Sequence, residues 1–91
     1  MEKSEVLKKI RSIAEEVTEC SIGEEYEPFN EVAIDHICAD SLDRITLITK
    51  CEEHFNISIS DYDAYFIYSF EELANLICVS IKAKEKTADK I

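Results

Sequence analysis

The 91-residue sequence contains one glycine (Gly23), one proline (Pro28) and no tryptophan. Both helix-breaking residues fall within 20–40, so the rest of the chain favours helices separated by one irregular stretch. No run is long or apolar enough to cross a membrane, and the N-terminus has no apolar signal-peptide core. We therefore expect a cytoplasmic protein without membrane insertion.

Basic residues are scarce: ten Lys and Arg stand against twenty Asp and Glu, a net charge of -10. Such a charge is repelled by the phosphate backbone, which argues against a nucleic-acid partner. It favours solubility, or protein partners that carry basic patches. Residues 21–40 hold six acidic residues and no basic ones, so the negative charge is concentrated just before Ser41.

The four cysteines form no Cys-x-x-Cys pair. In a cytosolic protein they are expected to be reduced, and we predict that Cys20, Cys51 and Cys78 are small buried apolar residues. His36 and Cys38 with the distant Cys20 make only a weak metal pattern, because zinc sites usually show two close ligand pairs.

Periodicity predicts four helices. Apolar residues recur at helical spacing over 3–19, and a second helix is expected over 41–55, with Asp40 as its N-cap. Residues 61–67 suggest a short helix. Residues 69–82 suggest a last helix, opened by a Ser-Phe-Glu-Glu capping box.

The predicted fold is all-α, a small four-helix bundle of three longer helices and one short one with a long first loop at 20–40. The helical domain is expected over residues 1–83, with a flexible tail at 84–91. A connection of this length is uncommon in a compact domain unless it has a function. Here it leads the chain to Ser41.

The helix predicted over 41–55 has two apolar stripes. The first contains Leu47, Ile48, Cys51 and Phe55, and the second contains Leu42, Ile45 and Thr49. Packing on one side of a helix needs only one stripe. The second stripe faces a partner or a ligand, or else the helix is wedged between two neighbours.

Ser41 is expected to be exposed in the first turn of that helix, where free N–H groups and the helix dipole favour a phosphate ester. From this residue alone, an ordinary helix-start serine is the favoured interpretation. Nucleophilic catalysis would need a nearby base. His36 lies in the loop, and His54 is about 20 Å away along the helix axis at 1.5 Å per residue. We therefore predict that the protein is not an enzyme.

One stretch resembles the acyl carrier protein family. It begins with Ala39-Asp40-Ser41-Leu42-Asp43 and continues with Ile45, Leu47, Ile48, Glu52, Glu53 and Phe55. The resemblance covers residues 3–82, and the order of the predicted helices is that of the family. It implies that Ser41 carries a 4'-phosphopantetheine arm, transferred from coenzyme A by a phosphopantetheinyl transferase, on which acyl groups are held as thioesters.

The resemblance also implies roles for the neighbours of Ser41. Asp40 would cap the helix beside the phosphate, and Leu42 and Ile45 would belong to the surface that partner enzymes bind. Three acidic residues would meet basic docking patches on acyl-transferring and synthase enzymes: Asp43, Glu52 and Glu53. The protein would be a monomer serving fatty-acid, polyketide or related specialised synthesis.

Two other functions stay open at this point. The same serine and fold would suit an aminoacyl or D-alanyl carrier, although the acidity and Leu42 favour an acyl group. A protein-interaction module without an arm would present the second stripe to a partner.

Several residues depart from the family pattern. Cys38 replaces a common glycine, Arg44 and Lys50 add positive charge to a usually acidic helix, and Thr46 stands where an acidic residue is common. These changes would weaken docking to generic partners, so we expect a specialised carrier. The Cys38 thiol is also a candidate for a thioester or a disulfide with the arm.

Overall fold

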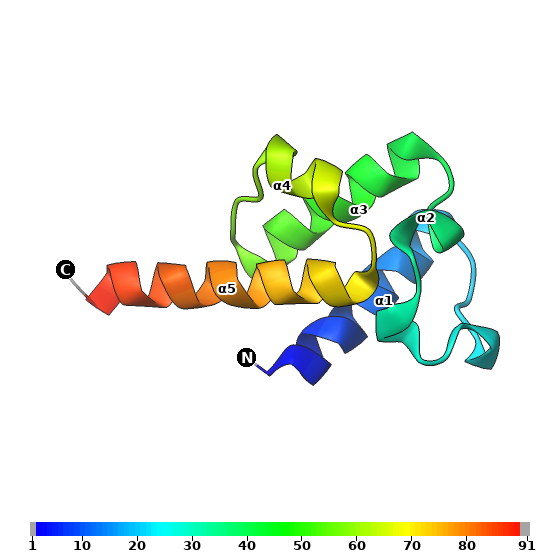
Figure 1. The fold of residues 1–91 in the computed structure, drawn as a ribbon, viewed down its shortest axis with the longest axis horizontal. Coiled ribbons are helices and arrows are strands. Elements are labelled where there is room, and N and C mark those ends of the chain that lie inside the picture. Colours follow the sequence, from blue (N-terminus) through cyan, green and yellow to red (C-terminus); the bar gives the residue numbers. More distant parts are fainter. Residues whose placement is uncertain (1, 90–91) are drawn as a thin grey trace.

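The structure is a computed structural model that describes the backbone of residues 2–89 and the side chains of residues 2–84. Three helices are long: α1 (Lys3–Thr18), α3 (Ser41–Phe55) and α5 (Phe70–Asp89). Two are short: α2 (Ile34–Ile37) and α4 (Asp61–Phe66) (Figure 1). The predicted all-α class is confirmed, and α2 is an extra single turn inside the predicted first loop.

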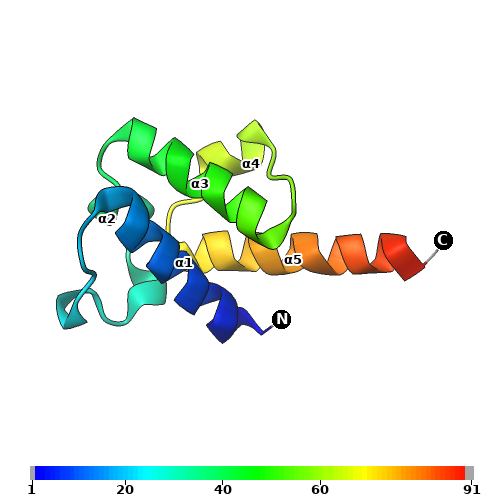
Figure 2. The same ribbon diagram turned by 180° about the vertical axis from the view of Figure 1, so that it is seen from behind.

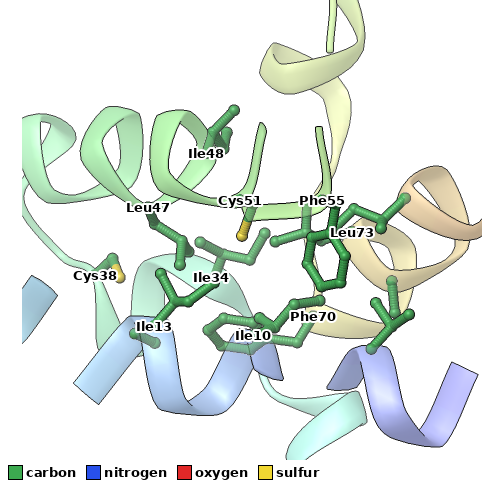
Figure 3. Close-up of a cluster of buried hydrophobic side chains, with 14 of the residues drawn as sticks. Ile10, Ile13, Ile34, Cys38, Leu47, Ile48, Cys51, Phe55, Phe70 and Leu73 are labelled. Atoms are coloured by element: carbon green, nitrogen blue, oxygen red, sulfur yellow. The ribbon is translucent and has the colours of Figure 1, made fainter. Parts of the chain in front are cut away.

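The core lies where α1 packs against both α3 and α5 (Figures 1 and 2). Helix α1 contributes Val6, Ile10, Ile13 and Ala14 from its predicted stripe, all of them buried. Figure 3 shows Ile10 and Ile13 facing side chains from α3 and from the start of α5. Burial of these stripes stabilises the bundle, because apolar area removed from water contributes about 25 cal/mol per Å².

The first loop is packed against the bundle rather than loose. The Arg11 guanidinium of α1 donates to the carbonyl of Ile22 and forms an ion pair with Glu27 at 3.1 Å. The buried ring of Phe29 stacks on Phe70 at a centroid distance of 4.3 Å. Two 3-10 turns shape the loop, at Glu24–Tyr26 and Phe29–Glu31.

Backbone hydrogen bonds join the end of the loop to the segment before α5. The Ile34 N–H donates to the Tyr68 carbonyl at 2.8 Å, and the Phe70 N–H donates to the Val32 carbonyl at 3.1 Å. These bonds fix α2 and therefore the approach of the chain to α3. They connect residues far apart in sequence, so no local pattern predicted them.

Helix α5 begins as predicted but ends later. Ser69 caps it by accepting from the Glu72 N–H at 3.2 Å, while the Glu72 carboxylate accepts from the Tyr68 N–H at 2.9 Å. The helix continues to Asp89 instead of ending near residue 82. Lys84 Nζ donates to the Asn56 carbonyl at 2.7 Å. Flexibility of the segment 84–91 stays a prediction, and residues 90–91 lie outside the described part.

The cysteines are all free thiols, and they differ in burial. The prediction is confirmed for Cys51, which is buried, and it is wrong for Cys20, which is exposed after the end of α1. Cys78 is half-buried. Among the side chains described for residues 2–84, no cluster of three or more His, Cys, Asp or Glu is arranged to hold a metal ion. No described helix combines the length and the apolar character needed to cross a membrane.

Candidate functional site

The start of α3 has the geometry predicted for it. The Asp40 carboxylate accepts from the Leu42 N–H at 2.8 Å, so Asp40 is the N-cap. The Arg44 N–H donates to the Asp40 carbonyl at 3.1 Å and begins the helical hydrogen-bond ladder. Ser41 is therefore the first helical residue, and it is exposed.

The two stripes of α3 lie in different surroundings. Leu47 and Cys51 are fully buried, and Figure 3 shows both pointing toward the core, with Ile48 on the opposite side of the helix. Leu42 and Ile45 are 66% and 62% exposed. Leu42 and Ile45 of the second stripe are therefore mostly exposed to solvent, whereas Ile48 is buried at 7% exposure.

A groove of about 620 Å³ runs beside Ser41 between α3 and α4. Its wall on α3 consists of Ser41, Arg44, Ile45 and Ile48. The facing residues are Asp35, Asp61, Ala64, Tyr65, Phe66, Ile67 and Tyr68. Apolar side chains with a few polar groups at one end are typical of sites for small or chain-like ligands.

Arg44 forms part of this groove wall and is only 18% exposed. Its Nη1 donates to Asp35 Oδ1 at 3.0 Å, and its Nη2 donates to the carbonyls of Ala64 and Ile67 at 2.9 and 2.5 Å. Arg44 therefore adds positive charge to α3 as expected, but internal contacts that the sequence did not reveal engage its guanidinium.

The other unusual polar residues of α3 also make internal contacts. Lys50 Nζ lies 3.2 Å from Glu16 Oε1 of α1, in an ion pair between exposed side chains. The Thr46 hydroxyl donates to the Leu42 carbonyl at 2.8 Å. An exposed ion pair such as Lys50–Glu16 contributes little to stability.

The three acidic residues predicted to meet partners differ in their surroundings. Glu53 is exposed, whereas Asp43 and Glu52 are half-buried. Glu52 Oε2 accepts from the Ile59 N–H at 2.9 Å, so this carboxylate also fastens the connection after α3. The sequence pattern did not reveal this second role, because the acceptor and donor are brought together only by the turn at Asn56.

Cys38 lies close to Ser41 in sequence but is buried, with 1% of its surface exposed. Burial, with a smaller effect of the Asp43 charge, raises the pKa of the Cys38 thiol to about 11. A protonated thiol without solvent access is a poor nucleophile. The structure therefore argues against a thioester or disulfide role for Cys38.

Neither histidine is hydrogen-bonded to Ser41 in the described part of the chain. The His36 ring lies edge-on to Tyr26 at a centroid distance of 5.9 Å. The His54 ring contacts Phe55 at 4.9 Å, at the opposite end of α3 from Ser41. Ser41 is thus an exposed hydroxyl beside the groove, and both histidine rings contact aromatic rings.

Comparison with known proteins decides the family. The chain is 38% identical over 82 residues to an acyl carrier protein of Cyanidium caldarium, a match covering 90% of the chain and 93% of the relative. The chain belongs to the acyl carrier protein family. This membership confirms the resemblance inferred from residues 39–43 and the helix order.

Other members of the family align over shorter stretches. An acyl carrier protein of Campylobacter lari is 33% identical over 61 residues, covering 67% of the chain and 79% of the relative. Acyl carrier protein 4, chloroplastic, of Arabidopsis thaliana is 32% identical over 75 residues, covering 82% of the chain and 53% of the relative. No protein-family model matches the chain.

Proposed function

We propose that this acyl carrier protein holds acyl groups as thioesters on a 4'-phosphopantetheine arm attached to the Ser41 hydroxyl. The observation that carries the proposal is the position of Ser41, exposed in the first turn of α3 at the edge of the groove. It would act as a carrier rather than a catalyst, with the transferase activating the hydroxyl.

The residues around Ser41 suit a phosphodiester. The start of a helix favours negative charge, because its N–H groups and dipole are directed at the ligand. The Asp40 carboxylate, which lies beside this position, is already engaged by the Leu42 N–H. Arg44 supplies positive charge one turn further along. When attached, the arm supplies the terminal thiol that forms the thioester.

The groove supports an apolar cargo. Ile45, Ile48 and Ala64 line it beyond Ser41, so an alkyl chain would exchange water for apolar side chains. Burying one methylene group contributes about 0.8 kcal/mol. An aminoacyl or D-alanyl group has little apolar area to bury, so the groove favours an acyl cargo of fatty-acid, polyketide or related specialised synthesis.

The exposed face of α3 would bind the partner enzymes. Leu42 and Ile45 offer apolar area, and Asp43, Glu52 and Glu53 would face basic patches on the phosphopantetheinyl transferase and on acyl-transferring and synthase enzymes. Together with the net charge of -10, these acids would steer encounter more than they add affinity. A cytoplasmic location and a monomeric state belong to this proposal.

The proposal is tested by incubating the purified protein with coenzyme A and a broad-specificity phosphopantetheinyl transferase, followed by intact and peptide mass spectrometry. We expect a mass gain of one phosphopantetheine on the peptide that contains Ser41. Ser41→Ala should show no gain. Ser4→Ala, which removes another exposed helical serine, should be modified as the unaltered protein is.

Two results would contradict the proposal in different ways. Absence of any mass gain with several transferases would refute the carrier function and favour an interaction module without an arm. A gain that persists in Ser41→Ala would refute the attachment site while leaving the carrier function standing.

A further inference from the structure

Helix α4 forms one wall of the groove, yet it is weakly packed. None of its six residues is buried. Tyr62, Tyr65 and Phe66 are 73%, 79% and 62% exposed, while Ala64 and the following Ile67 are half-buried. A helix this short is unstable alone, so contacts with the rest of the protein decide whether it stays in place.

Arg44 provides such a contact from α3. Both of its hydrogen bonds from Nη2 end on carbonyls at the C-terminal end of α4, those of Ala64 and Ile67. Carbonyls at the end of a helix lack partners within the helix, and a cation there also interacts favourably with the helix dipole. We call these two hydrogen bonds the Arg44 clamp. Figures 1 and 2 both show α4 beside α3, as the clamp requires.

The clamp lies close to the proposed attachment site. Ser41 and Arg44 are three residues apart on α3, a spacing that places side chains next to each other on one helix face. Both side chains line the groove, and Arg44 is the one basic residue among its described lining residues. A negatively charged group on Ser41 would therefore meet the guanidinium directly.

We propose that Arg44 is a positioning residue that holds α4 over the groove through this clamp, and that a phosphodiester on Ser41 releases it. The release rests on the function proposed above. Its consequence is that α4, which is held as a wall of the groove in the unmodified protein, becomes free to move aside for the cargo once Ser41 carries the arm.

The release follows from the shape of the guanidinium. Arginine usually binds phosphate through two parallel N–H groups on one edge of its planar fork. The guanidinium has two such edges. One is formed by Nε and Nη2 and the other by Nη1 and Nη2, so both include Nη2. Both Nη2 hydrogens are already donated to α4 carbonyls. A two-pronged contact with the phosphodiester must therefore break at least one bond of the clamp.

Hydrogen exchange of the α4 amides, followed by mass spectrometry or NMR, tests both parts. Wild type, Arg44→Met and Lys50→Met are compared before and after modification with coenzyme A. Lys50→Met is the matched control, because it removes the only other Lys or Arg side chain of α3, which pairs with Glu16 away from the groove.

In the unmodified protein, we expect the α4 amides of Arg44→Met to exchange at least about tenfold faster than those of wild type, since two charge-assisted bonds are lost. Amides of α1 and α5 should be unchanged and serve as internal references. In wild type and Lys50→Met, modification should accelerate exchange in α4, whereas in Arg44→Met it should have no further effect. A purely structural role of Arg44 would not make the response to modification depend on this residue.

The two parts can be refuted separately. Equal α4 exchange in unmodified wild type and Arg44→Met would overturn the clamp. An equal response to modification in both proteins would overturn the release. If Arg44→Met exchanges faster throughout the fold, Arg44→Lys replaces it, because lysine keeps the charge but lacks the planar fork. A sample without the mass gain would refute the proposed function and the release with it, while the clamp is still decided in the unmodified protein.

Discussion

Helix α3 offers a matched pair of substitutions that separates its packing face from its docking face. Leu47 is fully buried, and Leu42 is 66% exposed on the same helix. Leu47→Ala and Leu42→Ala remove the same atoms and have nearly the same effect on helix propensity. Any difference in stability therefore measures burial.

The expected difference is large for a protein of this size. Replacing a fully buried leucine by alanine costs about 3–5 kcal/mol, through lost transfer energy and the cavity that remains. An exposed substitution usually stays within about 0.5 kcal/mol. A 91-residue domain has a total stability of about 5–14 kcal/mol, so Leu47→Ala should remove a large fraction of it.

Urea unfolding followed by circular dichroism measures both variants. With a slope of about 1–1.5 kcal/mol per M, the midpoint of Leu47→Ala should fall by about 2–5 M, and that of Leu42→Ala by less than about 0.5 M. Leu42→Ala should instead lower the transferase kcat/KM, because its side chain belongs to the proposed partner surface. Equal losses of stability would refute the assignment of the two faces of α3.

Two further outcomes are expected from the same unfolding assay. Asp40→Ala should lower the free energy of unfolding by about 1 kcal/mol, because the Leu42 N–H loses its acceptor. Asp40→Asn keeps an acceptor oxygen and should lower it by less. Equal losses in the two variants would show that the cap hydrogen bond does not contribute to stability. Burial raises the thiol pKa of Cys38 to about 11 and that of Cys51 to about 12, so the unfolded chain releases these protons first, from about pH 9 upward. The contribution of these thiols to the free energy of unfolding should therefore be fully present below about pH 9. It should fall between about pH 9 and pH 11, by up to about 1.4 kcal/mol per pH unit for each thiol. The double variant Cys38→Ala/Cys51→Ala should show a shallower fall, and an unchanged slope would refute this cause.

Much of the helical framework could be read from local patterns. The range 41–55 predicted for the second long helix agrees with α3, and Asp40 is its cap as expected. Ser60 and Ser69 likewise cap α4 and α5 by accepting from the N–H three residues later. Capping and apolar periodicity depend on residues within one or two turns, so sequence alone displays them.

Contacts between residues that lie far apart along the chain could not be predicted from the sequence. The sequence predicted that Arg44 and Lys50 add positive charge to the second long helix, but it did not reveal their partners, which are 9 to 34 residues away in the chain. Cys20 was expected to be buried because cysteine usually is, yet it follows the end of α1 and is exposed. Burial depends on what packs over a residue, and one sequence does not contain that information in local form.

The sequence by itself determined the three long helices and α4, the caps of α3, α4 and α5, and the family motif around Ser41, because these depend on neighbouring residues. Only the tertiary structure decided the groove beside Ser41. Its two walls come from α3 and α4, and Arg44 joins them through carbonyls 20 and 23 residues away. Backbone carbonyls carry no residue identity, so no sequence pattern marks them as partners until folding brings them together.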